Sequence, residues 1–289
     1  MDKHVAFVTA PEWPALYSDD LLAVAALQAL GCQVSPVSWH SCSNAALERF
    51  DAIVVRSPWD WFNFRDHFRD FLTRLGQLET RVFNPPAVLQ SFADKTYLPR
   101  LAAAGVPIVP TLVLTPAQLP SVPELLAAHG WEEAVLKPAF TGGAFEAHRF
   151  ARAGAEAALA QLSVLPAHER WLLQPFQPQI AGGEWSFLFF DGFFSHAVKK
   201  VPLASDWRVQ SLHGGLASAA EAPPALVAQA AEILRRAAPD TLYARVDGVV
   251  LEDVLHLMEL EVVEPELFFR FEPQAATRFA RALVRRLEA

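Results

Sequence analysis

Short apolar runs alternate with amphipathic segments over the first 90 residues. His4–Thr9 and Asp51–Arg56 are nearly continuous apolar stretches, which is typical of strands buried on both faces of a parallel sheet. A helix is predicted over Leu21–Leu30, closed by Gly31, and the apolar residues of Phe64–Leu75 recur at helical spacing. The pattern predicts a parallel α/β domain whose ligand-binding loops follow the carboxyl ends of the strands.

Beyond residue 90 the predicted elements are shorter and the pattern is mixed. They are helices around 94–104, 123–129, 154–162, 224–238 and 273–287, and strands around 134–137, 147–150 and 171–175. Asp191-Gly192 joins two aromatic-rich runs, which is the signature of a type I′ hairpin. A second hairpin is predicted over Tyr243–Glu266. We expect three units, comprising residues 1–90, 91–170 and 171–289.

Three acids mark the second hairpin. Asp247 lies in its first strand, and Glu259 and Glu261 lie in its second. Because side chains alternate along a strand, Glu259 and Glu261 point to the same face, about 7 Å apart. Carboxylates among apolar neighbours need a cation, and a cluster of oxygen ligands suits Mg2+. The alternative is an edge hairpin whose acids face water.

Composition narrows the class of protein. The chain has 289 residues, of which 52% are hydrophobic and 19% charged, as expected of an ordered globular protein. The net charge of -8 argues against a general nucleic-acid or anionic-membrane partner. Cys32 and Cys42 are too few for a disulfide framework. Neither a signal-peptide core nor a membrane-length apolar run occurs, so we expect a cytoplasmic protein.

Two loops carry further candidate residues. Lys137 ends an apolar strand just before Gly142-Gly143, whose backbone N–H groups can turn toward phosphate oxygens. Taken alone, this lysine is equally an ordinary strand-end residue, and the glycine pair matches no established nucleotide motif. In the loop after the strand ending at Arg56, Trp59 and Asp60 suit recognition of a small polar substrate. The alternative is an aromatic-rich loop that packs on its neighbour.

Seven motifs, in order along the chain, resemble those of the ATP-grasp superfamily of carboxylate–amine ligases. The likeness is to the glutathione-synthetase-like branch and, within it, to cycloserine-synthetase-type enzymes. The motifs are DKTYLPRLAAAGVPIVPT, LKPAFTGG, LQPF, GGEWSFLFFDGFFSHAVKKVP, DWRVQSLHGG, LYARVDGVV and MELEVVEPELFF. The resemblance covers residues from about 84 to 269. It implies an N-terminal substrate domain followed by two α+β subdomains that sandwich ATP.

The same resemblance implies roles for individual residues. Those expected to contact the nucleotide are Lys95, Lys137, Gly142, Gly143, Gln174, Pro175, Phe176 and Glu184. Those expected to hold two Mg2+ ions, with Mn2+ as an alternative, are Asp247, Glu259 and Glu261. Lys200 and Arg208 are expected to face the transferred phosphate. Those expected to contact the substrate are Arg56, Ser57, Trp59, Asp60 and His213.

The implied reaction is ATP- and Mg2+-dependent amide formation from a small carboxylate and an amine through an acyl phosphate, with release of ADP and phosphate. The alternatives are a catalytically inactive nucleotide-binding regulator or scaffold, and simple phosphoryl transfer. Two motifs depart from common patterns: Glu259-Leu-Glu261 replaces the frequent Glu-x-Asn, and RSPWDWF replaces RSTWDY. The substrates, the inter- or intramolecular course of ligation, homo-oligomerisation and the pathway are left open.

Overall fold

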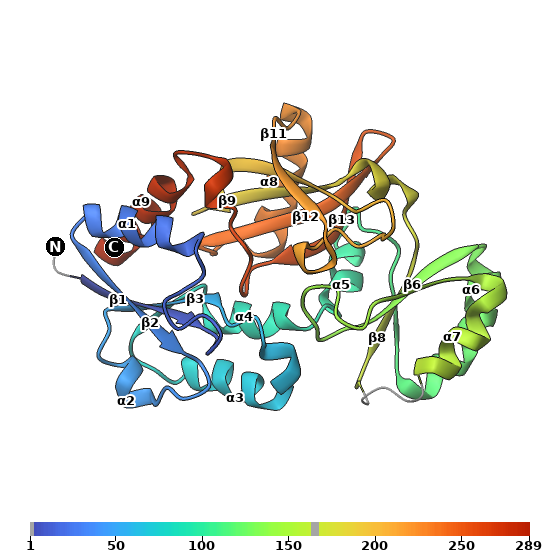
Figure 1. The fold of residues 1–289 in the computed structure, drawn as a ribbon, viewed down its shortest axis with the longest axis horizontal. Helices are drawn as coiled ribbons and strands as arrows, with labels where there is room; N and C mark the ends of the chain where they lie inside the picture. The colour runs from blue at the N-terminus through green and yellow to red at the C-terminus, as the bar shows by residue number, and fades with distance from the viewer. Residues whose placement is uncertain (1–2, 163–167) are drawn as a thin grey trace.

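A four-stranded parallel sheet forms the N-terminal part of the chain, and the computed structural model describes residues 3–162 and 168–289 (Figure 1). Its strands lie in the order β2 (Cys32–Ser38), β1 (Lys3–Thr9), β3 (Ala52–Ser57) and β4 (Arg81–Phe83). The helices of this part are α1 (Asp20–Ala29), α2 (Asn44–Leu47), α3 (Arg65–Leu75) and α4 (Pro86–Ala93). All three strand pairs are parallel, so the predicted parallel domain is confirmed.

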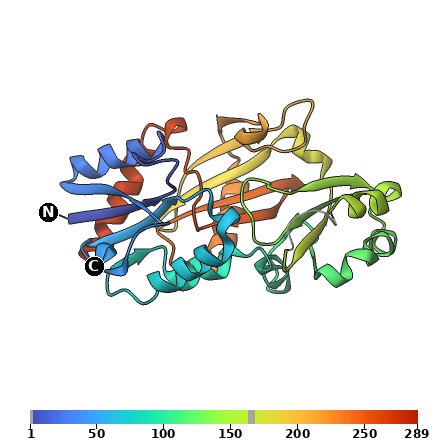
Figure 2. The same ribbon diagram turned by 60° about the horizontal axis from the view of Figure 1, so that its bottom comes forward.

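A five-stranded antiparallel sheet occupies the middle of the molecule (Figure 2). Its strands lie in the order β11 (Leu216–Ala220), β10 (Phe193–Val201), β9 (Glu184–Phe190), β12 (Tyr243–Leu251) and β13 (Val254–Glu261). Both predicted hairpins are confirmed. Asp191 and Gly192 have φ of 54° and 77°, and Glu252 and Asp253 have 49° and 63°. Positive φ at both central residues is what a type I′ turn requires.

A smaller antiparallel sheet forms the far end of the molecule. Its strands lie in the order β5 (Leu112–Leu114), β8 (Trp171–Pro175), β6 (Glu133–Pro138) and β7 (His148–Ala151), and its helices are α6 (Val122–His129) and α7 (Ala155–Leu162). Strand β8 pairs with β5 and β6, so Trp171–Pro175 belongs to this sheet.

Further helices and turns complete the described part of the chain. They are α5 (Tyr97–Ala103), α8 (Pro224–Ala237) and α9 (Ala275–Glu288), with 3-10 turns η1 (Trp61–Phe64), η2 (Pro116–Ser121), η3 (Arg152–Gly154), η4 (Pro178–Gly182), η5 (Ser211–His213) and η6 (Phe269–Phe271). The elements that were not predicted include α2, α4 and β11. A proline pair that suggested a break begins α4, because proline fits the first turn of a helix. The small residues of β11 give no strand pattern.

One hydrophobic core joins the parallel sheet to the central sheet. Phe279 of α9 is fully buried, and its ring lies 6.3 Å from that of Phe7 on β1 and 5.5 Å from that of Phe190 on β9. Helix α9 also packs beside α1, which brings both chain termini to the same end of the molecule (Figure 1). Burial of a large apolar side chain contributes about 1.5–3 kcal/mol, so this shared core holds the two sheets together.

Buried hydrogen bonds fix the same junction. The Asn84 side chain donates to the carbonyl oxygens of Tyr243 and Val262, at 2.9 and 2.7 Å. The Tyr243 hydroxyl donates to Val55 O at 2.7 Å and to Val263 O at 3.1 Å. These bonds connect the end of β3 to the segment that follows β13. That segment carries part of the site described below.

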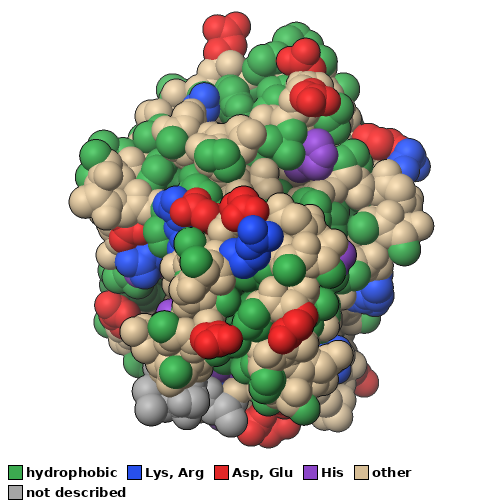
Figure 3. All heavy atoms as spheres, turned by 90° about the vertical axis from the view of Figure 1, so that its right-hand side faces the viewer, with side chains coloured by type: hydrophobic (Ala, Val, Ile, Leu, Met, Phe, Trp, Pro, Cys, Tyr) green, Lys and Arg blue, Asp and Glu red, His purple; other side chains and the backbone are tan. Residues whose placement is uncertain are grey.

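The surface at the far end of the molecule carries charges of both signs. Acidic, basic and hydrophobic side chains are interspersed over the face shown in Figure 3. Among the helices that the structure describes, none has the length and apolar character needed to cross a membrane.

Candidate active site

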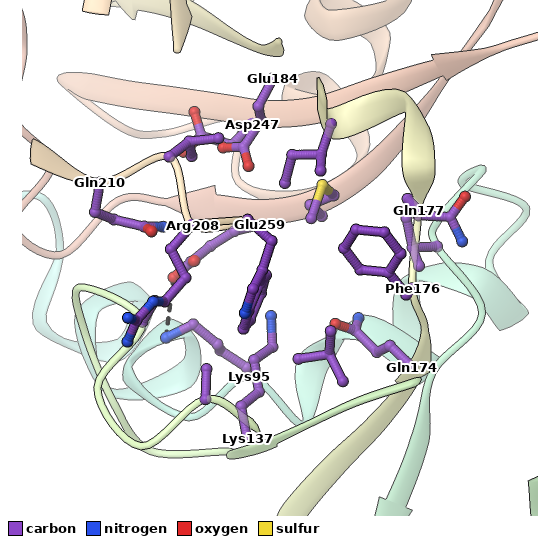
Figure 4. Close-up of a pocket in the computed structure, with 18 of the residues that line it drawn as sticks. Lys95, Lys137, Gln174, Phe176, Gln177, Glu184, Arg208, Gln210, Asp247 and Glu259 are labelled. Atoms are coloured by element: carbon purple, nitrogen blue, oxygen red, sulfur yellow. Dashed lines mark ion pairs between the residues drawn. The ribbon is translucent and has the colours of Figure 1, made fainter. Parts of the chain in front are cut away.

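A pocket lies between the small sheet and the central sheet. It spans about 820 Å3, counting the part open to solvent. In Figure 4, Lys95, Lys137 and Gln174 lie on one side, and Glu184 and Asp247 lie on the other. The expected residues that line it are Lys95, Lys137, Gly142, Gly143, Gln174, Pro175, Phe176, Glu184, Arg208, Asp247 and Glu259.

One end of the pocket is apolar. Val109, Val135, Ile180 and Met258 line it, and Phe176 stands beside them. These residues come from four separate segments of the sequence and meet only in the folded chain. Such a surface suits a flat, weakly polar ring.

The other end of the pocket carries two lysines, Lys95 and Lys137, which differ in their ion pairing. Lys95 is buried, with Nζ 2.9 Å from Glu259 Oε1, and it also donates to Thr141 O. Burial acts to lower the pKa of Lys95, but Glu259 outweighs this effect and the pKa is raised. Lys137 has no ion pair within the described residues, and burial lowers its pKa. Lys137 is therefore the cation that is available to an anionic ligand.

Lys200 lies between two carboxylates. It pairs in register with Glu184 across the β9–β10 hairpin, and its Nζ is 2.6 Å from Glu184 Oε1 and 2.8 Å from Asp247 Oδ2. Burial opposes a charged lysine, but the two acids outweigh it and raise the pKa of Lys200. Burial raises the pKa of Glu184. Lys200 is thus a buried counter-ion behind the pocket wall, and it does not line the pocket.

The three expected metal ligands lie on paired strands, and each is neutralised by a base. Asp247 stands opposite Glu259 in the β12–β13 register. Asp247 binds Arg245 at 2.9 Å, Glu259 binds Lys95, and Glu261 contacts Arg245. Within residues 3–162 and 168–289, no three acidic, histidine or cysteine side chains already form a metal-binding group.

Protonation follows from these contacts. Burial opposes ionisation of Asp247, but Arg245 and Lys200 outweigh it and lower the pKa of Asp247. Burial raises the pKa of Glu261 to about 8, and Glu259 adds to this effect despite the contact with Arg245. Arg245 was not predicted, although the spacing Arg-x-Asp on one strand places both side chains on the same face.

A loop that contains the glycine pair covers one side of the pocket. Gly143 has φ of 60°, a conformation that favours glycine. A Cβ atom at Gly142 would lie 3.4 Å from the ring of Phe62, so the loop packs closely on the N-terminal part. His213 is partly exposed and its Nε2 lies 3.2 Å from Gly143 O. His213 therefore contacts the covering loop and does not line the pocket.

Arg208 lines the pocket but has a partner of its own. Its Nη2 donates to Asp206 Oδ2 at 2.8 Å, and its Nε donates to Asp206 Oδ1 at 3.1 Å. These bonds lower the pKa of Asp206. A phosphate group would have to share this guanidinium with Asp206 or displace it.

The residues expected to contact the substrate lie apart from this pocket. Arg56 is buried, with Nη2 2.8 Å from Asp20 Oδ1 and 3.1 Å from Pro265 O. The hydroxyl oxygens of Ser57 and Thr9 are 2.9 Å apart. Asp60 accepts a 2.8 Å bond from Trp39 Nε1 and lies 2.6 Å from His40 Nε2.

Trp59 and Trp61 connect this loop to the segment after β13. Trp59 Nε1 donates to Glu264 O at 2.9 Å, and Trp61 Nε1 donates to Glu264 Oε1. Neither Trp61 nor Glu264 was predicted as a site residue. Trp61 and Glu264 lie 203 residues apart in the sequence, so no local pattern marks either as a site residue.

The three-sheet arrangement, with its pocket between the two antiparallel sheets, defines an ATP-grasp ligase, an enzyme that forms carbon–nitrogen bonds. Residues 5–84 match the family model "D-cycloserine synthetase DcsG, N-terminal domain". Because it is also 34% identical to a DcsG protein over 84% of that protein's length, the chain belongs to the family of D-cycloserine synthetase DcsG.

The relatives support this assignment over nearly the full length. Cycloserine biosynthesis protein DcsG from Streptomyces lavendulae is 34% identical over 255 residues, which are 83% of this chain and 84% of that protein. The crystal structure of D-cycloserine synthetase DcsG matches with a TM-score of 0.88 at 30% identity, over 98% of this chain and 99% of that chain. D-alanine–D-alanine ligase from Bacillus anthracis, solved with ATP, has a TM-score of 0.69 at 13% identity over 99% and 97%, a likeness of fold alone.

Proposed function

We propose that this enzyme activates a small carboxylate with ATP and joins it to an amine through an acyl phosphate, in a Mg2+-dependent reaction. We further propose that both groups belong to one molecule, so that the product is a cyclic amide, as the names of the relatives suggest. The observation that carries the proposal is the pocket itself, which sets Lys95 and Lys137 opposite Asp247 and Glu259.

The proposed placement of ATP follows from the two ends of the pocket. The apolar end beside Phe176 accepts the base, and Glu184 accepts hydrogen bonds from the ribose hydroxyls. The phosphates reach Lys137, which forms no ion pair with any residue that the structure describes, and the backbone of the Gly142-Gly143 loop. Anions bind well where a lysine and free N–H groups converge.

The acidic residues suit Mg2+ by their chemistry. Asp247, Glu259 and Glu261 offer only oxygen ligands, which Mg2+ prefers. Lys95 and Arg245 now neutralise Glu259 and Glu261, so we propose that these acids hold the metal by exchanging one cation for another. When bound, Mg2+ offsets the negative charge of the phosphates during transfer.

In the first step a substrate carboxylate oxygen attacks the γ-phosphorus, the bond from that phosphorus to the β,γ-bridging oxygen breaks, and ADP leaves. In the second step the amine attacks the acyl carbon, the carbon–oxygen bond to phosphate breaks, and the nitrogen loses a proton. Lys95, Lys137 and Arg208 stabilise negative charge on the transferred group. The loop at Gly142-Gly143 excludes water, which would otherwise hydrolyse the acyl phosphate.

An isotope experiment tests the mechanism. A panel of amino acids labelled with oxygen-18 in the carboxylate is incubated with the enzyme, ATP and Mg2+, and the phosphate is analysed by mass spectrometry. One labelled oxygen per phosphate, with ADP as the other product, is the expected result. Formation of AMP and pyrophosphate would refute the acyl-phosphate route.

A matched pair of variants tests the site. We expect Glu259→Gln to abolish ADP release while the protein stays folded, and Glu252→Gln in the exposed turn of the same hairpin to retain it. A product lighter than its single substrate by one water would establish intramolecular ligation. A product that contains two substrate molecules would exclude it.

A further inference from the structure

Glu264 differs from every other acid around the pocket because it has no cationic partner. Asp247, Glu259, Glu261, Glu184 and Glu266 each form an ion pair with a lysine or arginine. Glu264 forms none within the described residues. Its Oε1 accepts a hydrogen bond from Trp61 Nε1, and no hydrogen bond is made to Oε2 in the described part of the chain.

The position of Glu264 is fixed by both halves of the molecule. Its carbonyl oxygen accepts a 2.9 Å bond from Trp59 Nε1, and the preceding residue, Val263, binds the Tyr243 hydroxyl at 3.1 Å. The covering loop reaches it as well, since a Cβ atom at Gly142 would lie 3.7 Å from Glu264 Oε1. These contacts fix the backbone of Glu264, and the bond from Trp61 holds its carboxylate in place.

Glu264 shares a small cavity with the metal-site acids. The cavity spans about 250 Å3, counting open solvent, and Glu259, Glu261, Lys95 and Trp61 also line it. Burial raises the pKa of Glu264, and the hydrogen bond from Trp61 and the charge of Lys95 offset only part of this effect. Loss of hydration at an ionised group is offset only by a partner of opposite charge, so a ligand that brings a cation would complete the site.

An ammonium group fits Glu264 better than a metal ion does. Mg2+ takes six oxygen ligands, whereas Glu264 offers one oxygen without a protein donor. An ammonium needs only one or two acceptors and also binds well beside aromatic rings. Trp61 and Phe92 supply aromatic rings in the lining of the same cavity.

We propose that Glu264 is a specificity-determining residue that holds the α-ammonium of a zwitterionic amino-acid substrate. The proposal rests on the proposed function, because the carboxylate of that substrate is the group activated beside Glu259 and Glu261. In an α-amino acid the two groups are separated by one carbon, and Glu264 lines the same cavity wall as Glu259 and Glu261, so one substrate can reach both. An ammonium held by Glu264 keeps its proton and is not the attacking amine, which is therefore a second nitrogen.

Titration calorimetry on the full-length protein saturated with Mg2+ and a non-hydrolysable ATP analogue tests this proposal. The probes are the D- and L-forms of alanine and serine, each compared with its desamino analogue, propionate or 3-hydroxypropionate. Loss of one partner from a buried charge pair removes at least about thirtyfold in affinity. We expect the best amino acid to bind at least about thirtyfold more tightly than its analogue.

The variants decide the role of the residue. Glu264→Gln should reduce the preference to within about threefold and leave the affinity for the ATP analogue unchanged, and Glu264→Asp should restore part of it. Glu272→Gln, which removes an acid paired with Arg278 away from the pocket, should keep the full preference. Equal binding of ammonium and desamino probes, or an unchanged preference in Glu264→Gln, would overturn the proposal. Absence of labelled phosphate would refute the proposed function, while the titration would still decide the role of Glu264.

Discussion

Replacement of Lys200 by methionine tests whether the pocket wall depends on one buried cation. Lys200 is 5% exposed and bridges Glu184 and Asp247, which are 5% and 2% exposed. Methionine fills nearly the same volume without the charge. The variant therefore leaves Glu184 with no counter-ion and Asp247 with Arg245 alone.

The magnitude follows from the cost of isolating a buried charge. Removal of one partner from a buried ion pair destabilises a protein by about 3–5 kcal/mol, because the remaining charge loses its compensation. Lys200 serves two acids, but the second contact at Asp247 is shared with Arg245, so we expect a loss of about 3–5 kcal/mol and not twice that. Glu184 should also take up a proton near neutral pH, since burial already raises its pKa.

Urea unfolding of the wild type, Lys200→Met, Glu184→Gln and the double variant forms a complete cycle. Because Glu184→Gln removes the stranded charge, the double variant should be more stable than Lys200→Met alone. Proton uptake by Glu184 predicts that the stability of Lys200→Met increases as the pH falls from 8 to 6. A coupling free energy between Lys200 and Glu184 in this cycle would show that their interaction stabilises the folded state.

Two outcomes would refute this reasoning. A loss below about 1 kcal/mol in Lys200→Met would show that water or rearrangement solvates the acids. Additive effects in the cycle would show that Lys200 and Glu184 do not act on each other, whatever their separation of 2.6 Å. Loss of ligase activity without loss of stability would instead favour direct contact between Lys200 and the transferred phosphate.

Three further variants separate binding from stability. Lys137→Met should weaken ATP binding by about 10- to 100-fold and change the free energy of unfolding by less than about 1 kcal/mol, because this lysine forms no ion pair among residues 3–162 and 168–289; calorimetry with an ATP analogue and urea unfolding check both values. Arg56→Met should destabilise the fold by about 3–5 kcal/mol through the stranded Asp20, and a fully stable variant with impaired substrate binding would instead support direct recognition. Burial lowers the pKa of His196 from 6.5 to about 4, so the unfolded chain binds a proton in that window and the folded chain does not. Stability should fall by up to about 3 kcal/mol as the pH drops from 6.5 to 4, and His196→Leu should remove most of this decline in pH-dependent thermal unfolding.

The pocket residues show how far local sequence leads. The motifs around Lys95, Lys137, Gln174, Glu184 and Asp247 were each expected near a nucleotide, and all five side chains line one pocket. Roles within the pocket remain proposals. The motifs did not reveal which groups form ion pairs. Lys95 pairs with Glu259, whereas Lys137 forms no ion pair in the part of the chain that the structure describes.

The loop after β3 shows where sequence reasoning stops. The expected contact of Arg56, Ser57 and Asp60 with substrate stays a prediction; what the sequence did not reveal is that each also bonds to protein groups beside the parallel sheet. Their partners include Asp20, 36 residues away, and Pro265, 209 residues away. No spacing rule relates residues at such separations.

The sequence by itself determined the parallel domain, the two hairpins with a type I′ turn at Asp191-Gly192, and the order of the motifs. Each of these depends on rules that act over a few residues: side-chain period, turn conformation and capping. Only the tertiary structure decided which charges are compensated. Lys200 between two acids, buried Arg56 and unpartnered Glu264 depend on contacts between distant segments, and the energy of a buried charge is set by what lies within a few ångströms of it.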